Sequence, residues 1–172
     1  MSDQKKPKRR DFLYTASYTV GAVGIGAAVW PLIDQMNPDR AQRALATTEV
    51  DVSQVEPGNS ITILWRGKPV FLKRRTQEEI SEVRAVSLND LPDPQKDEDR
   101  VKIGKDEWLV MLGVCTHLGC VPLKDKGDYK GWFCPCHGSH YDGSGRVRKG
   151  PAPKNMEIPK FEFVDNNTIK IG

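Results

Sequence analysis

The chain has 172 residues, of which 26 are lysine or arginine and 23 are aspartate or glutamate, giving a net charge of +3. So small an excess of positive charge, much of it near the N-terminus, gives no indication of nucleic-acid binding. The sequence contains no internal repeat, no glycine-rich phosphate loop and no Ser-His-Asp arrangement. The residues with distinctive chemistry are four cysteines and three histidines, which all lie in two short loops.

The N-terminal segment predicts a membrane anchor. Basic residues precede a stretch from Phe12 to Ile33 that carries no charge. As a helix this stretch would be about 33 Å long, which is enough to cross a bilayer. The run Arg9-Arg10-Asp11-Phe12-Leu13 resembles a twin-arginine export signal, which directs folded proteins across the membrane. Positive charge before the helix predicts a cytoplasmic N-terminus, with the rest of the chain outside.

The position and length of the apolar stretch also indicate whether signal peptidase cleaves the export signal. Ala44-Leu45-Ala46 has the form of a signal-peptidase site, but it lies well beyond the apolar stretch, which exceeds the roughly 7–15 residues of a cleaved core. We therefore predict a cytoplasmic tail over residues 1–11 and an uncleaved transmembrane anchor over 12–36. Residues 37–48 follow this anchor, and their composition suits a short rigid helix.

The remaining residues, 49–172, have the size of one domain, and their patterns are mainly β. Four short runs rich in apolar residues predict the strands of two hairpins: 60–65 with 69–72, and 161–163 with 168–171. Residues 66–68 form the predicted turn of the first hairpin. The predicted fold class is therefore mainly β and antiparallel, behind a single N-terminal transmembrane helix.

Between the two hairpins the patterns are more varied. Thr76 with Glu79 three residues later is a capping box, which predicts a short helix ending near Arg84. The charged segment 93–107 is predicted to be a solvated surface loop, with a contact for partner subunits as the alternative. An apolar run at 108–114 leads directly into the first cysteine loop.

The two loops place cysteine and histidine at fixed spacings, Cys115-x-His117 in the first and Cys134-x-x-His137 in the second. Thiolate and imidazole groups in such proximity indicate a metal. Structural zinc also uses two cysteines and two histidines, but its usual spacing pairs cysteine with cysteine. The mixed spacing resembles that of the Rieske iron–sulfur proteins, and it favours their [2Fe–2S] cluster over zinc.

The resemblance to the Rieske family implies a role for each of these residues. Cys115 and Cys134 would hold the inner iron of the single cluster, and His117 and His137 would hold the outer, more exposed iron. Neutral imidazoles in place of thiolates raise the reduction potential. Their free ring nitrogens can also exchange a proton when the iron changes oxidation state. His137 is the predicted catalytic residue, because it would receive the proton of the substrate.

The same resemblance implies that the two other cysteines, Cys120 and Cys136, form a disulfide that locks the loops together. Such a bond would contribute about 3 kcal/mol on the chain-entropy model. Two inert buried thiols are the alternative. In the family the extra pair is typical of members that oxidise quinols, whereas low-potential ferredoxins and ring-hydroxylating oxygenases generally lack it.

Three further features fit the quinol-oxidising branch of the family. A serine at the position of Ser139 donates to a bridging sulfide, and a tyrosine at the position of Tyr141 donates to a ligand sulfur, here Cys115. Both bonds would raise the potential by stabilising the reduced cluster, although an ordinary polar loop is the alternative. The run Gly150-Pro151-Ala152-Pro153 resembles the proline loop that covers the cluster, but a plain surface turn would look the same. His140 is not in a ligand position.

Over nearly its whole length the chain resembles the Rieske subunits of bacterial ubiquinol–cytochrome c oxidoreductases, the cytochrome bc complexes. This resemblance implies an antiparallel Rieske-type β domain with an inserted cluster-binding subdomain at about 112–153. The implied partners are a cytochrome b subunit, cytochrome c1 and ubiquinol, in a dimeric complex. The implied location is the bacterial inner membrane, with the domain over 49–172 in the periplasm.

The implied function is that of a redox subunit in a proton-translocating oxidoreductase. Ubiquinol would give one electron to the cluster and one proton to His137. The resemblance also implies that residues 37–48 are a flexible tether, on which the domain would swing to pass the electron to cytochrome c1. Three alternatives stay open: the small subunit of an arsenite-oxidase-like enzyme, a structural zinc module, and a plastoquinol-oxidising relative.

Overall fold

The computed structural model describes residues 8–37 and 46–172, which belong to two separate compact units. Among the described residues, the first unit contains one long helix and the second contains every strand. Most of the predicted tail (1–11) and most of the predicted tether (37–48) lie outside the described residues.

The helix of the first unit, α1 (Arg9–Asp34), contains most of the predicted anchor at 12–36. It begins after Lys8, whose backbone N–H donates to the carboxylate of Asp11 at 2.9 Å, so that an acidic group stands in the first turn. The helix continues through Pro31, and none of its side chains is buried within the unit. It is long and apolar enough to cross a membrane, and it fits a single-pass membrane anchor.

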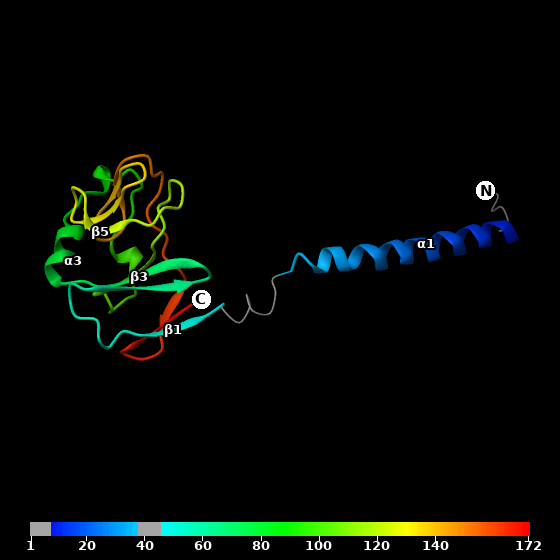
Figure 1. Cartoon of the computed structure of the whole chain (residues 1–172), viewed down its shortest axis with the longest axis horizontal. Helices are drawn as coiled ribbons and strands as arrows, with labels where there is room; N and C mark the ends of the chain where they lie inside the picture. Colours follow the sequence, from blue (N-terminus) through cyan, green and yellow to red (C-terminus); the bar gives the residue numbers. More distant parts are fainter. Residues whose placement is uncertain (1–7, 38–45) are drawn as a thin grey trace, which may run out of the picture. The chain divides into compact units, whose positions relative to one another are not determined.

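The second unit consists of three antiparallel sheets (Figure 1). The first sheet has the order β1-β10-β9, with bounds Thr48–Asp51, Thr168–Ile171 and Phe161–Phe163. The central sheet has the order β2-β3-β4, with bounds Ser60–Trp65, Lys68–Arg74 and Trp108–Leu112. The third sheet has the order β5-β6-β7-β8, with bounds Leu123–Lys126, Gly131–Cys134, Ser139–Tyr141 and Val147–Lys149.

Only short helices connect these strands: α3 (Gln77–Arg84) and two 3-10 turns, η1 (Leu88–Asp90) and η2 (Glu98–Arg100). The third sheet is inserted in the sequence between β4 and β9. The described residues therefore confirm the predicted class, which is a mainly β, antiparallel domain behind an apolar N-terminal helix.

The central sheet separates two cores. Along β3, Val70 and Leu72 belong to a first core that they share with the first sheet, whereas Phe71 belongs to a second core that it shares with the third sheet. Neighbouring strand residues point to opposite faces, so β3 contributes to both cores. All five residues of β4 are buried. This two-sided burial explains the unbroken apolar run at 108–112, because a strand covered on both faces has no polar side.

Two of the connections between elements lie where the local sequence patterns predicted them. The hairpin β2–β3 turns at Arg66 and Gly67, whose φ angles of 50° and 73° both lie in the left-handed region of a tight hairpin turn. Lys68 is already the first residue of β3. Thr76 and Glu79 cap α3 reciprocally, with backbone-to-side-chain distances of 2.9 and 3.2 Å, and the helix ends at Arg84.

The prediction that 93–107 is a solvated loop is wrong for its centre. Asp97 and Arg100 are only 1% and 2% exposed. The carboxylate of Asp97 accepts hydrogen bonds from Arg75 and from the hydroxyl of Ser144, both at 2.6 Å. Arg100 donates to the carbonyl of Ser144 at 2.8 Å. Charged groups are buried where they are paired, and this segment thereby joins the central sheet to the chain around the third sheet.

Candidate metal centre

Two loops of similar construction carry the cysteines. The first, 115–120, follows β4, and the second, 134–138, joins β6 to β7. In each, the N–H of a glycine donates to the carbonyl of the cysteine four residues earlier: Gly119 to Cys115 at 2.9 Å and Gly138 to Cys134 at 3.0 Å. The φ angles of these glycines are +83° and +73°, a region that glycine adopts without strain. The repeated Cys-x-x-x-Gly spacing therefore produces a similar turn twice.

The four predicted ligand residues lie together at these loops. Cys115 and Cys134 are free, buried and in contact with each other. The rings of His117 and His137 have centroids 4.7 Å apart. His137 is exposed, whereas the Nδ1 atom of His117 is buried and has no hydrogen-bond partner among the described residues. An unpartnered buried nitrogen is costly in an ordinary protein interior, but it suits an atom whose lone pair binds a metal.

Cys120 and Cys136 form a disulfide, with their Cα atoms 6.7 Å apart, and this confirms the predicted pairing. The carbonyl of Cys120 also accepts the N–H of Cys115 at 2.8 Å, so that the first loop is closed at both ends. The sulfurs of Cys120, Cys134 and Cys136 lie within 4.8 Å of one another. Because two of them are bonded together, only Cys134 of this group can act as a thiolate ligand.

The two free thiols lie in different electrostatic environments. The hydroxyl of Tyr141 donates to Sγ of Cys115 at 3.2 Å. Burial opposes ionisation of Cys115, but the hydrogen bonds from Tyr141 and from the N–H of His117 outweigh it and lower the pKa of this thiol. Burial raises the pKa of Cys134. Burial and the bond to Cys115 raise the pKa of Tyr141 to about 12, so its hydroxyl keeps the proton that it donates.

Thr116, which the sequence did not single out, holds Tyr141 from the other side. Its N–H donates to the tyrosine oxygen at 3.2 Å, and its hydroxyl donates to the carbonyl of Lys154 at 2.6 Å. The buried hydroxyl of Ser139 accepts the N–H of Ala152 at 3.2 Å. Both contacts fasten the segment after Gly150 to the ligand loops. The only sequence signal for Thr116 was its place between two predicted ligand residues.

The segment Gly150-Pro151-Ala152-Pro153 packs directly on the second ligand loop. The φ of Gly150 is +100°, and a Cβ at this position would lie 2.5 Å from the carbonyl oxygen of Gly138. Any other residue would therefore push the two segments apart. His140 lies apart from the ligand set: its Nδ1 accepts the N–H of Asp128 at 3.1 Å.

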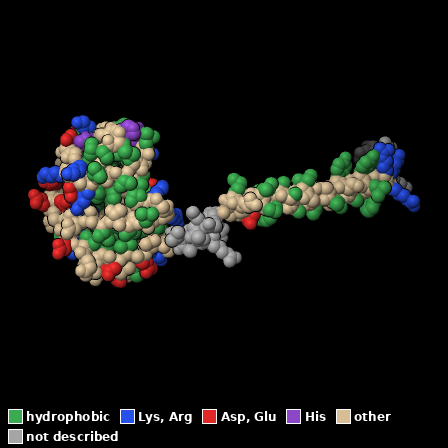
Figure 2. Space-filling view, viewed as in Figure 1, with side chains coloured by type: hydrophobic (Ala, Val, Ile, Leu, Met, Phe, Trp, Pro, Cys, Tyr) green, Lys and Arg blue, Asp and Glu red, His purple; other side chains and the backbone are tan. Residues whose placement is uncertain are grey.

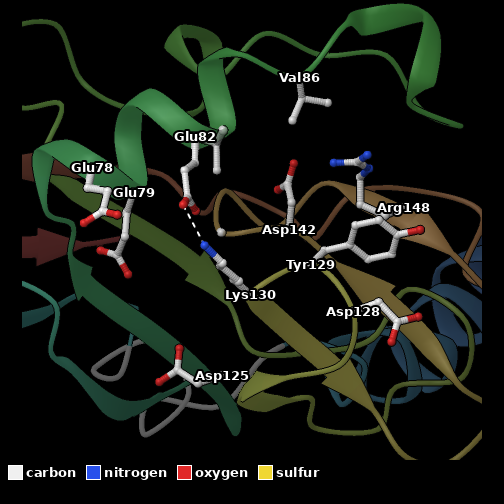
Figure 3. A pocket seen from close by; sticks show the side chains of 12 residues that line it. Glu78, Glu79, Glu82, Val86, Asp125, Asp128, Tyr129, Lys130, Asp142 and Arg148 are labelled. Carbon is white, nitrogen blue, oxygen red and sulfur yellow. Dashed lines mark hydrogen bonds and ion pairs between the residues drawn. The ribbon is translucent and has the colours of Figure 1, made fainter.

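A cavity of 520 Å³ lies elsewhere, between α3 and the third sheet (Figure 3). Its walls carry several carboxylates and an ion pair between Glu82 and Lys130 at 2.7 Å. Among its described lining residues there is no cysteine or histidine. The residues that could bind a soft metal therefore lie in the loops and not in this cavity.

The donor set at the loops fits a [2Fe–2S] cluster: two buried thiols, one of lowered pKa, and two adjacent imidazoles, one with an unpartnered buried nitrogen. Together with the antiparallel β fold, it defines a Rieske-type iron–sulfur protein. Residues 47–162 match the family model described as the Rieske [2Fe-2S] domain. Residues 1–39 match a second model, the TAT signal of the ubiquinol–cytochrome c reductase Fe-S subunit.

Comparison with individual proteins shows which branch of the Rieske family the chain resembles. The chain is 58% identical to the ubiquinol–cytochrome c reductase iron–sulfur subunit of Rhodospirillum rubrum, over 95% of this chain and 91% of the relative. It is 55% identical to that of Blastochloris viridis, over 99% and 96%. A solved hyperthermophilic respiratory complex III contains a chain that is 30% identical, with a TM-score of 0.53, over 91% of this chain and 98% of that one.

The chain therefore belongs to the family of Rieske iron–sulfur subunits of ubiquinol–cytochrome c reductase. It is a redox subunit of a cytochrome bc complex, and its cofactor is a [2Fe–2S] cluster.

Proposed function

We propose that Cys115 and Cys134 hold one iron of the cluster, and that His117 and His137 hold the other. With this centre the chain takes one electron and one proton from ubiquinol and passes the electron to cytochrome c1. The observation that carries the proposal is the convergence of two free buried thiols and two imidazoles on loops joined by a disulfide. The bound cluster supplies a one-electron acceptor of raised potential.

The exposed imidazole of His137 is the group that meets the substrate. An imidazole that binds metal through one nitrogen keeps the other free to accept a hydrogen bond and then a proton at neutral pH. The first loop and the residue after it carry exposed apolar side chains, with Leu118 71% and Val121 51% exposed. Figure 2 shows histidine side chains at the surface of the domain with hydrophobic side chains beside them. Such a surface suits docking against the quinol site of the cytochrome b subunit.

Two hydroxyl groups adjust the centre for this reaction. Tyr141 donates to Cys115, and Ser139 lies fully buried beside the ligand loop. Hydrogen bonds to ligand sulfur and to sulfide stabilise the more negative, reduced centre, so both residues raise the potential. The segment Gly150-Pro151-Ala152-Pro153, which packs on Gly138, covers the centre from one side.

The proposed topology follows the same order as the sequence. Residues 1–11 form a cytoplasmic tail whose Arg9 and Arg10 belong to the export signal, and 12–36 cross the bacterial inner membrane. Residues 37–48 form the tether, and 49–172 form the periplasmic domain, whose cluster-binding part spans about 112–153. The match of 1–39 to the signal model and the apolar α1 support this arrangement. The assembled complex is dimeric, and its turnover contributes to proton translocation.

The end of the tether has a defined attachment point. The carbonyl of Ala46 accepts hydrogen bonds from the indole N–H of Trp65 at 3.0 Å and from Arg66 at 3.3 Å. From Ala46 onward the chain is thus fixed to the domain.

The decisive experiment is a redox titration of the full chain in membranes, followed by electron paramagnetic resonance at several pH values. We expect a Rieske-type signal with a positive potential that falls as the pH rises, because reduction is coupled to uptake of a proton. A low potential independent of pH near neutrality would indicate an oxygenase-type carrier. Absence of the signal, with zinc bound, would refute the cluster assignment.

A further inference from the structure

Two aromatic rings stack where the central sheet meets the third sheet. Phe71 of β3 and Trp132 of β6 have ring centroids 4.4 Å apart and planes within 7° of parallel. Both side chains are buried in the second core. The indole N–H of Trp132 is buried without a hydrogen-bond partner among the described residues. Because no polar contact orients the indole, its position depends on packing, and above all on the stack with Phe71.

The outer edge of the Phe71 ring lies against Gly113. A Cβ at this glycine would be 2.5 to 2.8 Å from three carbons of the ring, closer than real Cβ contacts come. The φ of Gly113 is not in the left-handed region, so its backbone would accept other residues. Glycine is therefore required here by the ring. The ring in turn cannot swing freely away, because Trp132 stacks on it.

Both neighbours of the Phe71 ring stand two residues before a buried cysteine. Gly113 precedes Cys115, and Trp132 precedes Cys134. Trp132 and Cys134 point to the same face of β6, because side chains alternate along a strand. The backbone between each contact and its cysteine is short, so a shift at the ring is passed on to the sulfur.

The same ring also bears on the hydrogen bond to Cys115. Tyr141 is the direct cross-strand partner of Trp132 in the β6–β7 pair, and its hydroxyl lies 3.2 Å from Sγ of Cys115. The tyrosine is thus placed from the Trp132 side of the stack, whereas Cys115 is placed from the Gly113 side. The spacing across the Phe71 ring therefore affects the length of this bond.

We propose that Phe71 is a positioning residue for the metal centre. Its ring, held between Gly113 and Trp132, sets the spacing of Cys115 and Cys134 and the hydrogen bond from Tyr141, and through them the reduction potential. This role presupposes the proposed ligand set.

The test is a double-mutant cycle on the full chain in membranes, with Gly113→Ala, Phe71→Leu and the double variant. Potentials and g-values are measured by redox titration with paramagnetic resonance detection. Gly113→Ala inserts a methyl group against the ring, and we expect the equilibrium constant for reduction to fall about tenfold, which is 59 mV for one electron. Phe71→Leu removes the stack and should also lower the potential.

The double variant distinguishes action through the ring from a local effect of the methyl group. Leucine leaves room for the methyl group, so the shift caused by Gly113→Ala should largely disappear in the Phe71→Leu background. Leu72→Ala is the matched control, because Leu72 follows Phe71 in β3 but faces the first core. It should lower stability without moving the potential or the g-values.

Each outcome decides the proposal. An unchanged potential in Gly113→Ala, additive shifts in the double variant, or an equal shift in Leu72→Ala would overturn it. If Gly113→Ala fails to assemble, Phe71→Leu alone decides, and an unchanged potential there would overturn the role. Absence of a [2Fe–2S] signal from the unmodified chain would instead refute the ligand set itself, which separates the two failures.

Discussion

The two cores on either side of the central sheet are built from different chemistry. The first core is formed by aliphatic and aromatic side chains such as Leu72 and Ile169. The second contains two free thiols and Tyr141, and beside it lie buried ion pairs such as Arg146 with Asp142 at 2.8 Å. Apolar burial stabilises the first core without any partner, whereas the buried charges beside the second core each need a counter-charge. Damage to the metal centre should therefore leave the first core folded.

The largest expected effect is the loss of the cluster on replacement of a ligand. His137→Ala should abolish the paramagnetic signal and quinol oxidation together, because one iron would lose a proposed ligand. The exposed side chain of His137 makes little packing, so circular dichroism should report an intact β domain. His140→Ala is the control and should retain the signal. Retained quinol oxidation in His137→Ala would contradict the ligand assignment.

A second substitution breaks the buried network that joins the central sheet to the chain around the third sheet. Asp97→Asn removes a buried charge that pairs with Arg75 and accepts from Ser144, and it leaves the buried guanidinium without this counter-charge. We expect a loss of about 3–5 kcal/mol in the free energy of unfolding, measured with urea. Asp99→Asn, an exposed neighbour, should change it by less than about 0.5 kcal/mol. Equal effects of the two variants would mean that the network contributes nothing.

The same carboxylate predicts how stability depends on pH. Burial opposes its ionisation, but the hydrogen bonds from Arg75 and Ser144 outweigh this and hold the pKa of Asp97 below its ordinary value. Its contribution is therefore complete above the unfolded pKa of about 3.9 and is lost as the pH falls through the lower folded pKa. Urea unfolding below pH 4 should show this loss, and Asp97→Asn should not show it.

Removal of the disulfide should destabilise only the part of the domain around the second core. The double variant Cys120→Ala with Cys136→Ala leaves the ligand cysteines in place but frees the two loops from each other. We expect about 3 kcal/mol less stability. Heating should release the cluster at a lower temperature than in the unmodified chain, while the first core unfolds later. If the variant and the unmodified chain each lost the cluster and the circular-dichroism signal of the β domain at the same temperature, the two cores would not unfold separately.

The smallest expected effect leaves both cores folded and changes only the potential. Tyr141→Phe removes the hydrogen bond to Cys115, and we expect a potential lower by about 60 mV, a tenfold change for one electron. Ser139→Ala should likewise lower the potential and slow quinol oxidation. Tyr129→Phe is the control, since Tyr129 packs near His140 and not against a ligand. An unaltered potential in Tyr141→Phe would contradict a tuning role for the hydroxyl.

The features that sequence reasoning located are those with local signals. The turn at Arg66 and Gly67, the capping box of Thr76 and the disulfide were all expected, because each depends on neighbouring residues or on a family motif. The family resemblance implied an inserted subdomain at about 112–153, but the separate strands of its sheet were not predicted, since they are short and β5 is mostly charged. One of them begins at Gly131, where a Cβ would collide with the backbone of Tyr141 and Asp142.

Other features were hidden because their partners lie far away in the sequence. The charge of Asp97 predicted exposure, but the groups that allow its burial, Arg75 and Ser144, are 22 and 47 residues distant. The same reason hid Phe71, whose hydrophobicity predicted a strand but not its place between Gly113 and Trp132. Periodicity along the chain cannot report which side chains meet across sheets.

The burial of β4 on both faces has a consequence for electron transfer itself. The strand ends only three residues before Cys115, so the first ligand loop begins from a segment packed on two sides. Close-packed interiors resist displacement. If the ligands hardly move when the centre gains or loses an electron, the reorganisation energy stays small. The fold thus favours rapid electron exchange at a modest driving force.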